Sequence, residues 1–344
     1  MRLKGSVRLV IGMLLVALAT AACGGGGSGS SGDKVELRLG YFPNLTHAPA
    51  LVGVEKGYFT QELGSKVTLK TATFNQGTEA ATALLAGQLD ITYIGPNPAI
   101  NAFSKDKSSI RIISGAASGG AALVVKKSIN SAADLKGKKL ASPSIGNTQD
   151  VALRAWLGTQ GIKVTKEGGD VTIIGQQNSQ TLDTFKAGAI DGAWVPEPWA
   201  TRLELEGNGK VLVNEKDLWP NGQFVTTHII VRKQFLDEHP AVVEAFLRGH
   251  VKAVEFANSN PTDAKTVVNG AIGKLTGKPL QQATIDQAWS NLSFTFDPIK
   301  ASLEKSAKDA EAVGLLDPVD LNGIYSLTTL NKVLKILGKT EIAA

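Results

Sequence analysis

The sequence predicts an α/β fold with two similar lobes, each a mainly parallel sheet flanked by helices. The first observation is an internal repeat, because segment 185–202 (FKAGAIDGAWVPEPWATR) matches segment 84–101 (LLAGQLDITYIGPNPAIN) at an offset of 101 residues. The second is the alternation of strand-like and helix-like segments, which is typical of parallel sheets. The third is length, since the 322 residues after residue 22 exceed the size at which one core usually stops growing.

The repeat extends upstream at the same offset. Asp90 corresponds to Asp191 and Tyr93 to Trp194, while the turn 75–78 corresponds to 176–179 and the segment 41–47 to 142–148. Outside the Ala-Gly-x-x-Asp core the match lies in the pattern more than in identities. Three strand, polar turn and helix units in one half therefore correspond to three in the other.

The first residues are typical of a secretory signal. Residues 1–22 have a basic start, an apolar run at 9–18 and small residues before Cys23. The apolar run is too short to span a bilayer, which takes roughly 20 residues. The segment resembles a bacterial lipoprotein signal peptide, so we expect Cys23 to carry a lipid; the alternative is a free thiol in a flexible tail. Residues 23–34 then form the lipidated cysteine and a flexible Gly/Ser linker.

Composition excludes several classes of protein. Without the three basic residues of the signal, 33 Lys and Arg face 31 Asp and Glu, and no basic block is interleaved with aromatic residues. Nucleic-acid binding therefore has little support. Cys23 is the only cysteine in the sequence, which leaves no disulfide, no thiol nucleophile and no cysteine-based metal site.

The elements follow in a regular order. The first half is expected to hold strands at 35–40, 67–73, 90–94 and 110–114, with helices at 49–57, 78–85 and 96–103. Strands at 122–126, 139–142, 171–175 and 192–195, with helices at 149–157 and 181–186, form the second half. A strand at 226–232 returns to the first lobe, and helices follow at 241–258, 262–272, 284–289, 298–313 and 327–337. The lobes are thus 35–118 plus 227–344, and 119–226.

The turns after the strands predict a binding site. Ligands of α/β sheets lie beyond the carboxyl ends of strands, where helix N-termini attract anions without Lys or Arg. Nearly all of the turn side chains are neutral hydrogen-bonding groups. A small oxyanion held by dipoles fits this lining; the alternative is that each residue caps its own helix. The residues are Asn44, Thr46, His47, Asn75, Gln76, Asn97, Ser118, Ser144, Asn147, Thr148, Gln176 and Gln177.

Each of four further residues can be interpreted in two ways. Tyr93 and Trp194 stand at equivalent strand ends, as apolar walls for an organic tail or as core aromatics. Glu197 either contacts a ligand amino group or interacts with its own helix. His228 lies on the return strand, where a buried core histidine and a hinge residue are both compatible with the pattern.

Motifs for catalysis are missing from the sequence. The four histidines are scattered without a metal-binding pair on a helix, and no Gly-x-Ser-x-Gly turn occurs. The glycine-rich linker matches a dinucleotide fingerprint in letters, but no strand precedes it and no helix follows. We therefore expect no cofactor, no metal and no enzymatic activity.

Several stretches together resemble one family. These are the lipoprotein start, LRLGYFPNLTHAPALVGVEKGYF, GQLDITYIGP, ADLKGKKLASPSIGNTQDVALRAWL and VPEPWATRL. They are similar to the periplasmic solute-binding proteins for alkanesulfonates, taurine and nitrate, over nearly all of the chain after the signal. The resemblance implies a type II periplasmic-binding-protein fold, in which two lobes joined by two crossing strands close on the solute.

The resemblance also implies partners and a site. A monomer anchored by lipid outside the cytoplasm would deliver a small anion to a membrane permease with its ATPase. An alkanesulfonate is the first expectation; nitrate, taurine, bicarbonate and thiamine-precursor pyrimidines are alternatives. An extracytoplasmic enzyme on the same scaffold and a purely sensory receptor are the other classes considered. The binding residues expected are Asn44, Thr46, His47, Gln76, Asn97, Ser118, Gly119, Gly146, Asn147, Thr148, Gln176, Trp194 and Glu197.

Overall fold

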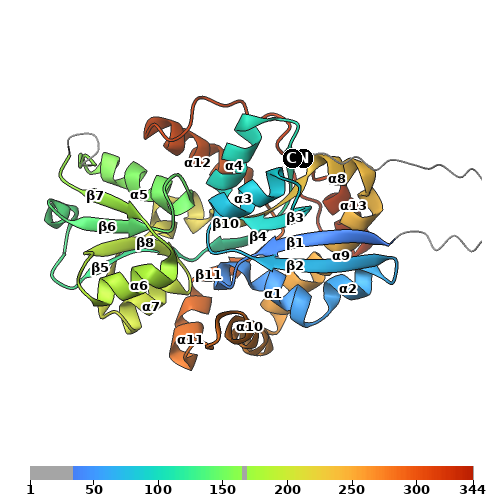
Figure 1. Ribbon diagram of the computed structural model, residues 1–344, viewed down its shortest axis with the longest axis horizontal. Coiled ribbons are helices and arrows are strands. Elements are labelled where there is room, and N and C mark those ends of the chain that lie inside the picture. Colours follow the sequence, from blue (N-terminus) through green and yellow to red (C-terminus); the bar gives the residue numbers. More distant parts are fainter. Residues whose placement is uncertain (1–33, 165–168, 344) are drawn as a thin grey trace, which may run out of the picture. The chain divides into compact units, whose positions relative to one another are not determined.

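Two mixed β-sheets, each covered by helices on both faces, make up the computed structural model over the described residues, 34–164 and 169–343 (Figure 1). The predicted signal, Cys23 and nearly all of the linker lie outside the described residues. No helix within the described residues is long and apolar enough to cross a membrane.

The first sheet has the strand order β11-β4-β10-β3-β1-β2. Strands β1, β2 and β3 pair in parallel, whereas β10 runs antiparallel to both β3 and β4, and β11 runs antiparallel to β4. The strands are β1 (Val35–Tyr41), β2 (Val67–Thr73), β3 (Ile91–Ile94), β4 (Ile110–Gly119), β10 (Val225–Arg232) and β11 (Leu292–Phe294).

The second sheet repeats this arrangement with the order β7-β6-β8-β5-β9. Strands β6, β7 and β8 pair in parallel, and β5 runs antiparallel to β8 and β9. The strands are β5 (Ala121–Lys126), β6 (Lys139–Ser142), β7 (Thr172–Gly175), β8 (Gly192–Pro196) and β9 (Gly209–Asn214).

The predicted α/β class is therefore confirmed. The sheets were predicted to be mainly parallel, and the structure shows that both are mixed. Strands joined by a helix within one sheet lie parallel, since the helix returns the chain to the same starting edge. Strands β5 and β10 each enter their sheet directly from the other lobe and so run against their neighbours. The order β2-β1-β3-β10-β4 of the first sheet therefore corresponds, strand by strand, to the order β7-β6-β8-β5-β9 of the second sheet.

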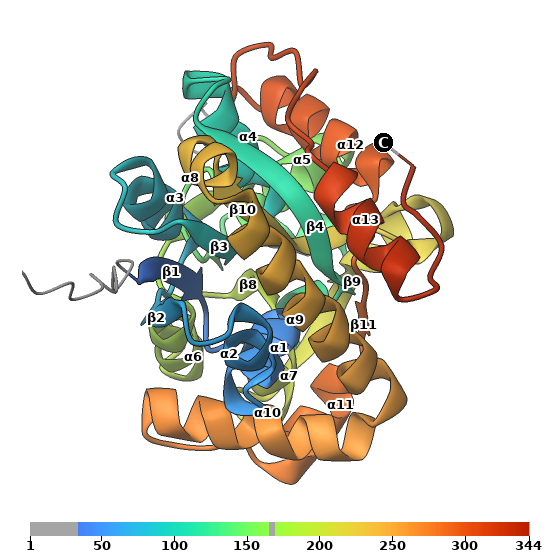
Figure 2. The same cartoon turned by 90° about the vertical axis from the view of Figure 1, so that its right-hand side faces the viewer.

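Helices cover both faces of each sheet. In the first lobe, α1, α2, α9 and α13 pack on one face and α3 and α4 on the other (Figure 2). The helices of this lobe are α1 (Ala48–Glu55), α2 (Tyr58–Leu63), α3 (Gly77–Leu85), α4 (Pro96–Lys105), α8 (Lys233–Glu238), α9 (Pro240–Ser259), α10 (Pro261–Thr276), α11 (Gln282–Ser290), α12 (Lys300–Ala312) and α13 (Thr328–Ile336).

In the second lobe, α5 packs on one face of the sheet and α6 with α7 on the other. The helices are α5 (Thr148–Thr159), α6 (Asn178–Lys186) and α7 (Trp199–Leu205). Short 3₁₀ segments complete the described chain: η1 (Leu45–His47), η2 (Ala132–Leu135), η4 (Glu215–Leu218) and η5 (Pro220–Gly222).

The sequence repeat is visible in side-chain contacts. The backbone N–H of Arg38 donates to Asp90 Oδ2 at 2.9 Å, and that of Lys139, which is 101 residues later, donates to Asp191 Oδ2 at 2.9 Å. Each carboxylate also binds the cation that ends the crossing strand: Arg232 Nη2 lies 2.8 Å from Asp90, and Lys126 Nζ lies 2.9 Å from Asp191. The repeated aspartates thus anchor β10 and β5.

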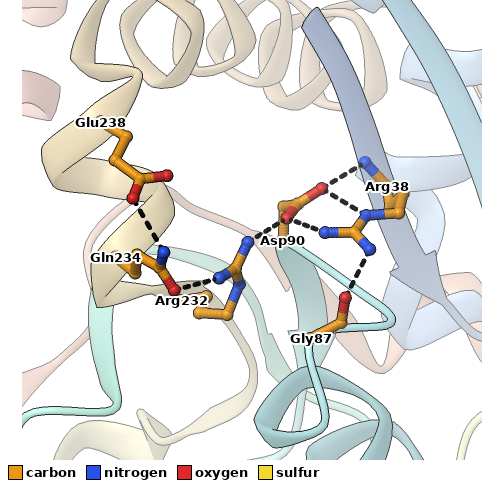
Figure 3. A network of polar contacts seen from close by, with 6 residues as sticks. All are labelled: Arg38, Gly87, Asp90, Arg232, Gln234 and Glu238. Carbon is orange, nitrogen blue, oxygen red and sulfur yellow. Dashed lines mark hydrogen bonds and ion pairs between the residues drawn. The ribbon is translucent and has the colours of Figure 1, made fainter.

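The Asp90 cluster is the larger of the two (Figure 3). Arg38 donates to Asp90 through Nε at 2.9 Å and Nη2 at 2.6 Å, and Arg232 continues to Gln234 at 2.7 Å. Burial opposes ionisation of Asp90, but the hydrogen bonds from Arg38 and Arg232 outweigh it and hold the pKa of this carboxyl below its usual range. The cluster precedes β3, at the end opposite to the polar turns.

Candidate functional site

A small polar cavity lies where the turns of the two lobes meet. Its volume is about 40 Å³, whereas one water needs roughly 10–15 Å³ on the same measure. From the first lobe and the return strand it is lined by Phe42, Asn44, Thr46, His47, Asn75, Gln76, Gly77, Gly95, Pro98, Thr226 and Thr227. From the second lobe it is lined by Pro143, Asn147, Thr148, Gln149, Asn178 and Pro196.

Helix N-termini from both lobes converge on this cavity. Helix α1 begins after His47, α3 after Gln76, α4 after Gly95 and α5 after Asn147, and all four of these capping residues line the cavity. The first N–H groups of a helix have no partner within it and carry roughly half a positive charge. The cavity is therefore electropositive without a cationic side chain.

The lining holds no charge of its own. Among the described residues around the cavity, none is Lys, Arg, Asp or Glu, and His47 is the titratable one. His47 is 3% exposed, stacks on Phe42 at 4.3 Å, and its Nδ1 accepts the Phe42 backbone N–H at 3.3 Å. Burial lowers the pKa of His47 to about 3, so its ring is neutral at pH 7 and carries its proton on Nε2.

Two buried oxygen atoms in the lining have no partner. Thr148 Oγ1 and Asn178 Oδ1 make no hydrogen bond, although the residues are only 7% and 6% exposed. Each belongs to the first residue of its helix, α5 and α6. Buried polar atoms nearly always find a partner in folded proteins, so these two atoms are available to a water or to a bound molecule.

The lobes touch around the cavity. Trp199 Nε1 on α7 donates to Asn44 Oδ1 at 3.0 Å, and Asn101 Nδ2 on α4 donates to the Gly146 carbonyl at 3.4 Å. Gly95 faces Thr148 so closely that a Cβ on this glycine would lie 2.5 Å from Thr148 Oγ1. Helices α4 and α5 lie next to each other here (Figure 1).

Seven residues from the predicted polar turns line this cavity together, namely Asn44, Thr46, His47, Asn75, Gln76, Asn147 and Thr148. Three other predicted side chains or backbone groups are occupied elsewhere. Asn97 Nδ2 donates to the Ser306 carbonyl on α12 at 3.1 Å, Gly146 N donates to Asp150 at 2.8 Å, and Gln176 Nε2 donates to Thr184 at 2.7 Å. The structure does not place these three at the cavity.

Trp194 lies in the core, away from the cavity. It is fully buried, and its Nε1 donates to Glu215 Oε2 at 2.7 Å. Its repeat counterpart Tyr93 is buried in the same way, with its hydroxyl 2.9 Å from His250 Nδ1. Of the two interpretations of these strand-end aromatics, the core aromatic is the one observed, because each side chain pairs with a buried group of its own lobe.

Ser118 and Gly119 lie where the chain first crosses between the two sheets. Gly119 ends β4 and Gly120 precedes β5, with φ angles of 80° and 69°, a conformation that glycine adopts without strain. Ser118 and Gly119 line a separate cavity of about 370 Å³. Thr226 Oγ1 of β10 donates to the Gly119 carbonyl at the end of β4, and this hydrogen bond links the two segments that cross between the lobes.

Glu197 lies next to this crossing, where its backbone N–H donates to the Gly120 carbonyl at 2.8 Å. Its carboxylate accepts hydrogen bonds from Thr201 N at 3.1 Å within α7 and from Asn291 Nδ2 of the other lobe at 2.7 Å. Burial raises the pKa of Glu197, and the hydrogen bonds from Asn291 and Thr201 partly offset this. The carboxylate therefore joins the lobes and does not face the cavity.

His228 is a core histidine. Its Nε2 lies 2.9 Å from the Pro298 carbonyl, and burial lowers its pKa to about 4. Sequence reasoning missed other lining residues, above all Thr226 and Thr227, and the available signal was this pair of adjacent polar residues near the start of β10. Asn178, which lies 101 residues after Gly77, was also not selected.

These features define a class of protein. Two lobes with the same strand order, two crossing strands and a polar cavity between the lobes form the fold of periplasmic binding proteins. The chain belongs to the NMT1-like family, whose model matches residues 30–271.

Individual relatives agree with this placement. The taurine-binding periplasmic protein of Escherichia coli K12 is 33% identical over 215 residues, which span 62% of this chain and 64% of that protein. The alkanesulfonate-binding protein SsuA of Xanthomonas axonopodis pv. citri, solved bound to MOPS, has a TM-score of 0.70 at 18% identity, covering 84% of this chain and 96% of that one. The nitrate-binding protein NrtA of Synechocystis PCC 6803 has a TM-score of 0.75 at 16% identity, covering 89% of each chain. The two structures show the fold alone.

Proposed function

We propose that this chain is the extracytoplasmic solute-binding component of an ABC importer and captures a small organic anion, an aliphatic sulfonate, between its lobes. The observation that carries the proposal is the neutral cavity at which helix N-termini meet the unpartnered Thr148 hydroxyl, which can donate to an oxyanion. The unpartnered Asn178 Oδ1 only accepts, so it would take a hydrogen-bond donor of the ligand and not the oxyanion itself.

Capture follows from closure of the lobes. The contacts of a ligand with both Gln76 of the first lobe and Thr148 of the second exist only when the lobes approach. A ligand that contacts both therefore favours the closed state. We assign residues 35–118 and 227–344 to one lobe and 119–226 to the other, with the hinge at Gly119 and Gly120.

Calorimetry with methanesulfonate, taurine, nitrate, bicarbonate and a pyrimidine tests the ligand class. We expect the sulfonate to bind, and the Thr148→Ala and Gln76→Ala variants to lose about 1–3 kcal/mol of binding free energy, the range for a hydrogen bond to a charged group. Thr159→Ala, at the exposed end of the same helix as Thr148, is the matched control. Unchanged affinity in both site variants would contradict the assigned site.

The role is one of binding and delivery, without turnover. The described residues around the cavity offer no carboxylate or cysteine, and a pKa of about 3 makes the neutral His47 a weak base. We expect NMR of the ligand after prolonged incubation to show it chemically unchanged. A permease and its ATPase are the partners that complete import.

Attachment to the membrane is proposed through a lipid on Cys23. The Cys23→Ala variant, expressed with its signal, is expected to leave the membrane fraction and appear in the soluble extracytoplasmic fraction. Equal membrane retention of the variant and the parent protein would contradict lipidation at this residue.

A further inference from the structure

Helix α5 differs from the other helices that begin at the cavity, because it carries a buried acid in its first turn. Asp150, the third residue of α5, is 0% exposed. Helices α1, α4 and α6 have no acid in their first turn, and Glu79 in the first turn of α3 is exposed. A buried negative charge at a helix N-terminus opposes the binding of an anion at the same N-terminus.

The Asp150 carboxylate holds the turn that leads into α5. Its Oδ1 accepts the Ser142 hydroxyl at 3.2 Å, and its Oδ2 accepts the Gly146 backbone N–H at 2.8 Å. The backbone N–H of Asp150 donates to Asn147 Oδ1 at 3.0 Å. Asp150 therefore orders the second-lobe wall of the cavity from behind. The residues of this turn and helix start that line the cavity are Pro143, Asn147, Thr148 and Gln149.

A neighbouring cation cancels the charge of this carboxylate. Arg154, one turn further along α5, donates through Nε to Asp150 Oδ2 at 3.1 Å. The Arg154 side chain is only 9% exposed, so solvent and salt screen the pair weakly. The pair as a whole is neutral, whereas Asp150 by itself would place a full negative charge behind the cavity wall.

The short distance to a bound anion makes that charge significant. Thr148, whose buried hydroxyl has no partner, opens α5 two residues before Asp150, which is about 3 Å along the helix axis. With the reach of the side chains, the Asp150 carboxylate lies roughly 8 Å from an anion held by the Thr148 hydroxyl. At an effective dielectric constant of about 20, two like charges at this distance shift a binding equilibrium roughly thirtyfold.

We propose that Arg154 determines the specificity of the cavity for anions by cancelling the charge of the carboxylate that orders its wall. This inference rests on the proposed function and adds to it a residue that acts on the ligand through another residue. Arg154 does not line the cavity, so it is a positioning residue and makes no contact with the ligand. The turn thereby keeps the hydrogen bonds of a carboxylate, and the α5 N-terminus stays electropositive.

Calorimetry with butanesulfonate at pH 7 measures the effect on the whole chain. Arg154→Gln leaves the Asp150 charge without its cation, and we expect this variant to bind roughly ten- to thirtyfold more weakly than the parent protein. Arg154→Lys keeps the positive charge and should bind nearly as tightly as the parent. Arg248→Gln on α9 is the matched control, because Arg248 also pairs with an acid one turn away, Glu244 at 3.1 Å, and does not line the cavity.

Asp150→Asn separates the effect of charge from a merely structural role. The asparagine side chain can still accept the Gly146 N–H, so the turn keeps this hydrogen bond. Since the negative charge is gone, we expect Asp150→Asn to bind butanesulfonate at least as tightly as the parent. Asp150→Asn combined with Arg154→Gln should restore the affinity that Arg154→Gln loses. A merely structural pair would instead make Asp150→Asn bind more weakly.

Each outcome decides between the claims. Parent-like binding by Arg154→Gln, or weaker binding by Asp150→Asn, would overturn the role of Arg154 and leave the anion site in place. If Arg154→Gln does not fold, the affinities of Asp150→Asn and of the double variant still decide the question. Failure of the parent protein itself to bind butanesulfonate would overturn the proposed function and the role of Arg154 with it.

Discussion

Replacing Gly95 by alanine tests whether closure of the lobes is what traps the ligand. In the structure, a Cβ on Gly95 would lie 2.5 Å from Thr148 Oγ1 and 3.5 Å from Thr148 Cβ. The backbone of Gly95, at φ −70° and ψ 159°, is one that alanine adopts without strain. The substitution therefore obstructs the approach of the two lobes and leaves the folding of each lobe intact.

The magnitude follows from the overlap. An added methyl group in a well-packed contact costs about 1–3 kcal/mol, which here applies to the closed state alone. We expect Gly95→Ala to weaken butanesulfonate binding by roughly 5- to 150-fold and to leave the melting temperature of the free protein nearly unchanged. Calorimetry gives the affinity, and small-angle scattering with saturating ligand shows whether closure is incomplete.

Two further variants make the test specific. Gly158→Ala lies on α5, where an added Cβ meets nothing within 4 Å, and we expect it to bind as the parent does. Adding Thr148→Ala removes the oxygen that the new methyl group meets, so the double variant should bind no more weakly than Thr148→Ala alone. The reasoning would be refuted if Gly95→Ala bound the ligand as tightly as the parent protein. It would also be refuted if the loss of binding free energy in the double variant equalled the sum of the losses in Gly95→Ala and Thr148→Ala.

Two buried carboxyl groups give the remaining predictions. Asp90→Asn should lower the free energy of unfolding by about 2–3 kcal/mol at pH 7, less than for a fully buried pair because Arg38 and Arg232 are partly exposed. Since the folded pKa of Asp90 is depressed, this stability is present above the unfolded pKa and is lost as pH falls through the folded value; urea unfolding at pH 7 and pH 3 that shows equal losses would contradict it. Burial raises the pKa of Glu215 to about 7, so its ionisation destabilises the fold as pH rises from about 4.5 to 7. Glu215→Gln keeps an acceptor for Trp194 and should therefore exceed the parent in stability at pH 8 and nearly match it at pH 4, as thermal unfolding at both values would show.

Much of the fold was predictable because its signals are local. The strand and helix segments follow from periodicity and turn residues within short windows, and the long C-terminal helices α9 to α13 lie close to the predicted segments. Strand β11 was missed, since three residues carry too little pattern and its pairing with β4 comes from residues far away in the chain. The mixed pairing of each sheet likewise depends on where β5 and β10 insert.

The candidate site was predictable in type and only partly in membership. Asn97, Gly146 and Gln176 occupy the same kind of polar turn as Asn44 and Thr148. Their groups bond to Ser306, Asp150 and Thr184 instead of facing the cavity. A sequence window does not reveal such a choice, because the competing partner can be more than 200 residues away, as Ser306 is from Asn97.

By itself, the sequence determined that this protein has two related α/β halves with neutral, amide-rich turns. That information is carried by contiguous residues and by a repeat at a fixed offset, visible down to the paired aspartates Asp90 and Asp191. Only the tertiary structure decided which turns meet, that Trp194 belongs to the core, and that Thr226 and Thr227 complete the cavity. The physical reason is that the direction and hydrogen bonding of a side chain depend on neighbours supplied by distant segments, which come together only when the chain has folded.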